Sequence, residues 1–222
     1  MIMKKKHIIF PLVFLVFGTV VIATVSGLSI KRYIRQNEFK NISAKNNVTE
    51  KNVQAEKGRL FFQAPKQKPE KTSIKIYKEK RVMELYGDNE LIGRFKVGLG
   101  RVPSGKKEKE GDLKTPEGTY YICYTNPKSK YDYFFGISYP NIDDAKEALN
   151  KKVIGKINYD RIEWAINNKE QPPWNTSLGG EIGIHGGGSK YDWTYGCIAL
   201  SNKDMDILKK YVGLKTMVEI YQ

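Results

Sequence analysis

The alternation of hydrophobic and polar positions divides the chain into parts with different physical requirements. Residues 8–30 form a run of 23 positions without a charge, and a helix needs roughly 20 apolar residues to cross a bilayer. Residues 31–73 are rich in Lys, Asn, Gln and Glu, which is typical of a solvated spacer. We therefore predict a basic tail over residues 1–7, a transmembrane anchor over 8–30, a basic linker over 31–73 and a folded domain over 74–222.

A cleaved signal peptide is the alternative interpretation of the apolar run. The apolar core of such a peptide usually spans roughly 7–15 residues and ends before small residues at the cleavage site. This run is longer, and residues 23–25 and 25–27 match such a site only weakly. The uncleaved anchor is therefore favoured. The lysines at positions 4–6 place the tail in the cytoplasm, although basic residues at 31, 32 and 35 act in the opposite sense. The folded domain is expected on the cell-wall or periplasmic side of the cell membrane.

In the folded domain, the spacing of apolar residues predicts mainly strands. Short runs of Ile, Val, Leu and Phe fill residues 74–97, and Gly87-Asp88-Asn89 supplies a turn between two of them. A further strand is expected over 119–125. The fold class is thus mainly β with a few helices (α+β). The predicted helices cover residues 143–151, 159–168 and 203–211, the last capped by Ser201 or Asn202.

The charge of the chain lies mostly outside the folded domain. The formal net charge is +14, of which +10 falls in residues 1–73 and only +4 in the rest. A basic chain raises the question of nucleic-acid binding, but the folded part is only mildly basic and has no basic strand studded with aromatic residues. No P-loop or dinucleotide fingerprint is present. We expect no nucleic-acid partner and no cofactor.

The most distinctive chemistry lies in residues 182–202. His185 ends an apolar strand and is followed by three glycines, and Cys197 follows twelve positions later, next to another glycine. A thiol and an imidazole that meet across a loop are the minimum apparatus of a cysteine nucleophile with its base. The alternative is structural, because isolated His and Cys residues are often satisfied or buried parts of a core. The glycine-rich surroundings favour catalysis, since core positions rarely need so much bare backbone.

The second cysteine, Cys123, lies among tyrosines in an ordinary strand pattern, and we interpret it as structural. A Cys123–Cys197 disulfide is conceivable in an exported protein, but it would remove the nucleophile and is disfavoured. The chain also lacks the spaced Cys and His partners that a zinc site requires, so no metal is expected.

Several short motifs occur in a fixed order along the folded domain. Thr115-Pro-Glu-Gly118 precedes a strand, Ile184-His-Gly186 comes later, and Thr194-Tyr-Gly-Cys-Ile-Ala-Leu200 follows. Together they resemble the L,D-transpeptidase catalytic domain, also called the YkuD domain, over about residues 74–221. The resemblance implies a β-sandwich or barrel-like domain behind the N-terminal transmembrane helix. It also includes Gly111-Asp112, Ser138-Tyr-Pro-Asn141 and Leu178-Gly-Gly180.

The resemblance implies roles for individual residues. Cys197 would be the nucleophile that attacks a peptidoglycan stem tetrapeptide, and His185 would accept and later donate the proton. The carbonyl of Gly186 would orient the imidazole. Backbone N–H groups at Tyr195, Gly196 and Cys197 would bind the oxyanion. Release of the terminal D-alanine and transfer to an amine of a second stem would form a 3→3 cross-link.

Two positions depart from the family pattern. Thr194-Tyr195 replaces a frequent Ser-His pair, and Ala199 stands where an arginine is common, which leaves the acceptor open. An amidase, peptidase or D-amino-acid exchange enzyme with the same Cys/His pair is therefore the alternative function, and a non-catalytic wall-binding module is a third. Trp174, Trp193 and Thr194 are candidates for the substrate cleft, with ordinary core packing as the alternative for the two tryptophans.

Overall fold

The computed structural model describes residues 58–222, and residues Leu60–Gln222 form one compact unit. The predicted basic tail, the apolar run over residues 8–30 and most of the linker lie outside the described residues. Within residues 58–222, no helix has both the length and the apolar character that crossing a membrane requires.

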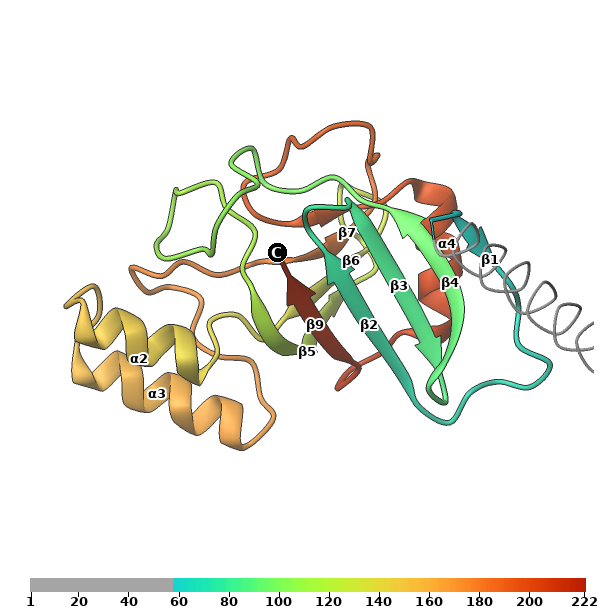
Figure 1. Ribbon diagram of the computed structural model, residues 1–222. Helices are drawn as coiled ribbons and strands as arrows, with labels where there is room; N and C mark the ends of the chain where they lie inside the picture. Colours follow the sequence, from blue (N-terminus) through green and yellow to red (C-terminus); the bar gives the residue numbers. More distant parts are fainter. Residues whose placement is uncertain (1–57) are drawn as a thin grey trace, which may run out of the picture. The chain divides into compact units, whose positions relative to one another are not determined.

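A curled sheet of nine strands forms the centre of this unit (Figure 1). Most neighbouring strands are antiparallel, whereas the β2–β9 and β7–β8 pairs are parallel. The spatial order is β1-β4-β3-β2-β9-β5-β6-β7-β8. The strands are β1 (Phe61–Phe62), β2 (Thr72–Tyr77), β3 (Val82–Gly87), β4 (Glu90–Lys96), β5 (Gly118–Asn126), β6 (Phe134–Ile137), β7 (Gly183–His185), β8 (Ile198–Ala199) and β9 (Met217–Tyr221).

The two halves of the sheet approach each other through the segment that follows β4. The amide of Gly98 donates to the carbonyl of Ala199 at 2.9 Å, and the amide of Ala199 donates back to Gly98 at 2.8 Å. Gly100 forms a second bridge, to Thr194. The curled sheet encloses a core of buried aliphatic and aromatic side chains, which supplies the main favourable term in folding. The closure brings the end of β4 beside the segment that contains Cys197.

Residues 58–222 contain three helices, and two of them begin with a side-chain cap. Asn141 and Asp144 form a reciprocal capping box at the start of α2 (Ile142–Asn150). Ser201 caps α4 (Asn202–Tyr211) by accepting from the amide of Asp204. Helix α3 (Lys156–Asn167) pairs with α2 around a separate small apolar cluster, and the pair lies to one side of the sheet (Figure 1). All three helices predicted in the folded domain are confirmed, with no end shifted by more than three residues.

The folded unit begins earlier than the predicted boundary at residue 74. Phe61 and Phe62 pair with β4 as the edge strand β1, and the Phe62 ring packs on Phe95 and Tyr211 with centroid distances of 6.4 and 5.8 Å. Strand β2 also begins two residues before Ile74. The two phenylalanines were visible in the sequence, but a strand of two residues is too short to show a period.

Candidate active site

Strands β7 and β8 bring His185 and Cys197 together. The strands are parallel, with Ile184 opposite Ile198 and His185 opposite Ala199. Cys197 directly precedes β8, so this register places it level with Gly183. Alternate residues of a strand share a face, and therefore His185 and Cys197 project from the same face of the β7–β8 pair. Residues twelve positions apart in the chain thus become diagonal neighbours.

A short hydrogen bond fixes the orientation of the His185 imidazole. Its Nδ1 atom lies 2.6 Å from the carbonyl oxygen of Gly186. A carbonyl oxygen can only accept, so Nδ1 carries the proton, and in the neutral ring the lone pair is on Nε2. No other described residue hydrogen-bonds to this Nε2. The nitrogen available to a substrate or thiol is therefore a base at neutral pH.

Two aromatic side chains, Tyr131 and Trp193, contact the imidazole and also each other. Tyr131 stacks on His185 at a centroid distance of 4.7 Å and an interplanar angle of 25°. Trp193 meets the imidazole edge-on at 5.6 Å, and its indole N–H donates to the carbonyl of Gly188 at 3.0 Å. Trp193 thus packs against the imidazole of His185. The sequence had not pointed to Tyr131.

Burial keeps His185 uncharged. The side chain is 3 % exposed, and this burial lowers the pKa of His185 from its ordinary value of 6.5, with the Gly186 hydrogen bond acting in the opposite direction. Desolvation disfavours the charged form of any group. The imidazole is therefore neutral throughout the neutral pH range.

The Cys197 thiol is also uncharged in the resting protein. Burial of the sulfur raises its pKa from 9.0 to about 11, while the backbone of Gly183 and the positive charge of Lys107 act to lower it. The thiol donates to the carbonyl oxygen of Glu181 at 3.5 Å. The residue as a whole is only half-buried. Cys123 is a free thiol too, with a pKa raised by burial to about 12.

The turn before Cys197 is pinned by Thr194. Its hydroxyl donates to the carbonyl of Cys197 at 2.7 Å and accepts from the amide of Gly196 at 3.1 Å. The Gly196 amide is therefore engaged, although we had expected it among the oxyanion donors. No described residue accepts a hydrogen bond from the amides of Tyr195 or Cys197. These two amides are the remaining candidates for an oxyanion site.

Glycine is required at position 196 by both conformation and space. Its φ of +132° lies in a region that side chains rarely adopt, and a Cβ there would lie 2.7 Å from the carbonyl oxygen of Lys114. The loop that contains the Gly111-Asp112 and Thr115-Pro116 motifs thus packs directly against the cysteine turn. This contact explains why motifs separated by some eighty positions form one structural unit.

Asp112 organises that loop. Its carboxylate accepts from the amides of Glu108, Lys109 and Lys114 at 2.8, 3.1 and 3.1 Å. It also pairs with Lys107 at 2.8 Å, and the Lys107 side chain is only 3 % exposed. The loop therefore carries a buried positive charge whose field reaches Cys197. Lys107 could not be predicted from the sequence, because its burial depends on the closed loop.

Two further predicted site residues, Tyr195 and Trp174, make contacts outside the Cys/His pair. Tyr195 is 69 % exposed, and the Arg101 guanidinium lies over its ring at 5.0 Å. Trp174 packs instead against Gly180. A Cβ atom added at Gly180 would lie 2.1 Å from the Cβ atom of Trp174. Because Glu181 follows Gly180, Trp174 contacts the residue next to the thiol's hydrogen-bond partner. Residues 58–222 contain no cluster of three His, Cys, Asp or Glu side chains able to hold a metal.

Residues 71–220 match the model of the YkuD family, described as the L,D-transpeptidase catalytic domain. The match spans more than half of the chain, so the chain belongs to this family. It has a peptidoglycan-related L,D-transpeptidase fold, and the family suggests a transferase.

Individual relatives overlap the chain only in part. A protein of Escherichia coli (strain K12) described as "Putative L,D-transpeptidase YafK" is 31 % identical over 87 residues, which cover 36 % of this chain and 35 % of that protein. The chain thus spans about a third of the relative's length. Among solved structures, the helical cell shape determining protein Pgp2 of Campylobacter jejuni aligns with a TM-score of 0.47 and 25 % identity, covering 68 % of this chain and 47 % of Pgp2. Bd1075 of Bdellovibrio bacteriovorus aligns with a TM-score of 0.45 and 20 % identity, covering 73 % of this chain and 54 % of Bd1075.

Proposed function

We propose that this protein is a peptidoglycan L,D-transpeptidase in which Cys197 is the nucleophile and His185 the general base. The observation that carries the proposal is the placement of both residues on one face of the β7–β8 pair. Nδ1 of His185 is bound to Gly186, and Nε2 has no hydrogen-bond partner within residues 58–222. The family assignment supports a stem peptide as the substrate.

Both partners are neutral at rest, so the proton moves during the attack rather than before it. The thiol proton, held at the Glu181 carbonyl in the resting protein, turns toward Nε2 and passes to it as sulfur bonds to the carbonyl carbon of the third stem residue. The developing oxyanion lies at the amides of Tyr195 and Cys197. The positive charge of Lys107 favours the thiolate character that forms on sulfur.

Collapse of this intermediate breaks the bond to the terminal D-alanine, and His185 returns its proton to the leaving amine. A thioester remains on Cys197. The side-chain amine of a second stem then attacks the thioester carbonyl, gives a proton to His185, and displaces the sulfur, which regains its proton. The product is a 3→3 cross-link, and the enzyme returns to its starting state.

Product analysis tests this proposal. The purified protein is incubated with tetrapeptide stems that carry a free side-chain amine, and the products are separated and weighed by mass spectrometry. The proposal predicts free D-alanine and a cross-linked dimer. Free tripeptide without dimer would instead assign a carboxypeptidase, and incorporation of an added D-amino acid would assign an exchange enzyme. If the folded protein forms none of these products, the interpretation that remains is a non-catalytic wall-binding module.

We further propose that residues 8–30 anchor the protein in the cell membrane and that the catalytic domain, from about residue 60, faces the cell wall. The support is the uncharged run of 23 residues, which is long enough to span a bilayer. Fractionation of cells that express the full chain or a variant lacking residues 1–30 tests this. Recovery of both proteins in the same soluble fraction would overturn it.

A further inference from the structure

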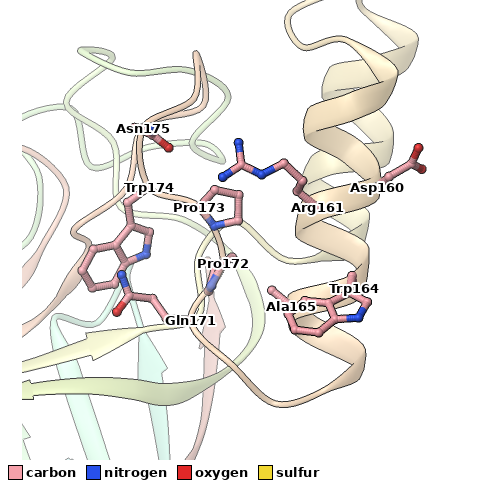
Figure 2. Close-up of a pocket in the computed structure, with 9 residues that line it drawn as sticks. All are labelled: Asp160, Arg161, Trp164, Ala165, Gln171, Pro172, Pro173, Trp174 and Asn175. Carbon is pink, nitrogen blue, oxygen red and sulfur yellow. The ribbon is translucent and has the colours of Figure 1, made fainter.

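A groove separates helix α3 from the loop over residues 171–175 (Figure 2), and no residue of the cysteine turn lines it. Its volume is about 580 Å³. The mechanism above uses none of the residues that line it. They combine two indoles, two prolines and several polar side chains: Asp160, Arg161, Trp164, Ala165, Gln171, Pro172, Pro173, Trp174 and Asn175.

Two tryptophans give the groove a fixed wall and an exposed wall. Trp174 is held by close packing on Gly180 and Gly136 and by an edge-on contact with Tyr124 at 5.8 Å. Trp164, on α3, is 59 % exposed. The buried residues of α3 are Ile162 and Ala165, so packing of this helix does not account for Trp164. A large exposed indole at the edge of a groove is a surface for a flat, partly apolar ligand.

Polar groups in the groove lack partners within the described part of the chain. The indole N–H of Trp174 is buried without an acceptor, and a buried donor of this kind normally has one. Arg161 reaches from α3 toward the loop (Figure 2) and pairs with no described carboxylate. The nearby carboxylate of Asp160 is already paired with Lys156. The groove thus offers several unused donors beside an indole face.

This chemistry favours a sugar. A pyranose ring presents C–H groups on its faces, which pack on indoles, and hydroxyl and acetamido oxygens at its edge, which need donors. A nucleic acid would need a strongly cationic surface, whereas Arg161 is the one cation among the lining residues.

The position of the groove fits a ligand that also reaches the thiol. The thiol contacts Glu181, the next residue is Gly180, and Gly180 packs on Trp174. Three extended peptide residues span about 10 Å. In peptidoglycan, three stem residues separate the attacked carbonyl from the sugar.

We propose that this groove binds an N-acetylated amino sugar of the glycan strand that carries the donor stem. Trp164 supplies the stacking surface, and Arg161 and the Trp174 indole N–H bind the sugar oxygens. The inference rests on the proposed function for the identity of the glycan, but its binding site is separate from the Cys/His pair.

The kinetic test compares two donors, the free tetrapeptide and the same tetrapeptide on its N-acetylglucosaminyl–N-acetylmuramyl disaccharide. The wild-type protein should prefer the disaccharide donor about tenfold in KM, as one stacking contact and one hydrogen bond allow. Trp164→Ala should abolish this preference and leave kcat/KM for the free tetrapeptide unchanged, while Trp164→Phe should keep part of it. Ile157→Ala is the matched control on α3, because Ile157 is 78 % exposed and does not line the groove.

A binding test separates this inference from the proposed chemistry. Tetra-N-acetylchitotetraose is titrated into the Cys197→Ala protein, and the three indole N–H signals are followed by NMR. The Trp174 signal should shift saturably, and Trp164→Ala or Arg161→Gln should weaken the effect at least about tenfold. Sugar binding without turnover in the wild-type protein would overturn the proposed function alone. Three results would overturn the sugar site. The first is turnover in which the wild-type and Trp164→Ala proteins prefer the disaccharide donor equally. The others are no shift of the Trp174 signal with the sugar, and a shift only with free tetrapeptide.

Discussion

The Nδ1 atom of His185 lies 2.6 Å from the carbonyl oxygen of Gly186, the residue that follows it in the chain. The hydrogen bond that orients the imidazole therefore comes from its own backbone rather than from a third side chain. A carboxylate partner would stabilise the charged ring, but a neutral carbonyl does so less, and burial further favours the neutral base. The pair at this site is a thiol and a neutral imidazole, not a preformed ion pair.

This charge state predicts the pH dependence of catalysis. The base must be unprotonated, and its pKa is lowered, so kcat/KM should hold across neutral pH and fall only as pH drops through a pKa below 6.5. Because the pKa of Cys197 is about 11, alkylation of the resting thiol by iodoacetamide should accelerate as pH rises toward 11. The two profiles are measured on the same preparation. A rate of alkylation that stays constant from pH 5 to 9 would show a preformed thiolate and contradict the neutral pair.

Replacement of Tyr131 by leucine should slow catalysis without unfolding the protein. The Tyr131 ring stacks on the imidazole at 4.7 Å, and aromatic pairs of this kind contribute about 0.5–1.5 kcal/mol. If that contact holds the ring in its reactive position, kcat/KM should fall roughly two- to tenfold. Tyr131→Phe keeps the ring and should retain the wild-type rate. Equal losses in both variants would mean that the phenol oxygen, not the stacking, matters.

Gly196→Ala should damage both stability and turnover. The methyl group would meet the Lys114 carbonyl at 2.7 Å, at a φ of +132° that alanine rarely adopts. We expect a loss of about 1–3 kcal/mol in the free energy of unfolding. Displacement of the turn should also misplace the amides of Tyr195 and Cys197, and loss of one oxyanion donor typically costs about 10²–10³ in kcat. Gly213→Ala is the control, since nothing lies within 4 Å of its added Cβ. If Gly196→Ala has wild-type kinetics, the conformation of this turn does not contribute to catalysis.

Asp192→Ala should lower stability more than an ordinary surface change. The Asp192 carboxylate accepts from the amide of Leu99, whose side chain is fully buried, at 2.9 Å, and it binds Arg81 through two nitrogens. The substitution leaves that amide without its partner, at a cost of about 1–3 kcal/mol. Urea denaturation measures the change. Asp206→Ala, which removes an exposed pair with Lys209, should change stability by less than about 0.5 kcal/mol, and equal effects would contradict the anchoring role.

The sequence predicts much of this architecture because its signals are local. The helices and the strand ending at His185 follow from spacing and caps within each segment. The contacts around the imidazole cannot be predicted in this way. Tyr131 reaches His185 because β6 pairs with β7 so that Phe134 lies opposite His185, and register between distant strands leaves no mark in either segment alone. Engagement of the Gly196 amide likewise depends on the Thr194 side-chain position, which spacing does not fix.

The groove beside α3 shows a different limit. Trp174 was a cleft candidate from its place in a loop, but Trp164 and Arg161 have the spacing of an ordinary helix surface. Only the fold brings that surface opposite residues 171–175 (Figure 2). A glycine at position 180 is also needed, because any side chain there would displace Trp174.

The most direct test of the account is the mass of the intact protein after exposure to a stem tetrapeptide without an acceptor amine. We predict an increase equal to the stem tripeptide minus one water, as a thioester replaces the thiol proton, with peptide mapping placing it on Cys197. Cys123→Ala should keep the adduct, because Cys123 lies in strand β5 and its pKa is raised by burial, and Cys197→Ala should lose it. An adduct on Cys123 would contradict catalysis by Cys197. So would the absence of any adduct on a folded protein that still hydrolyses the peptide.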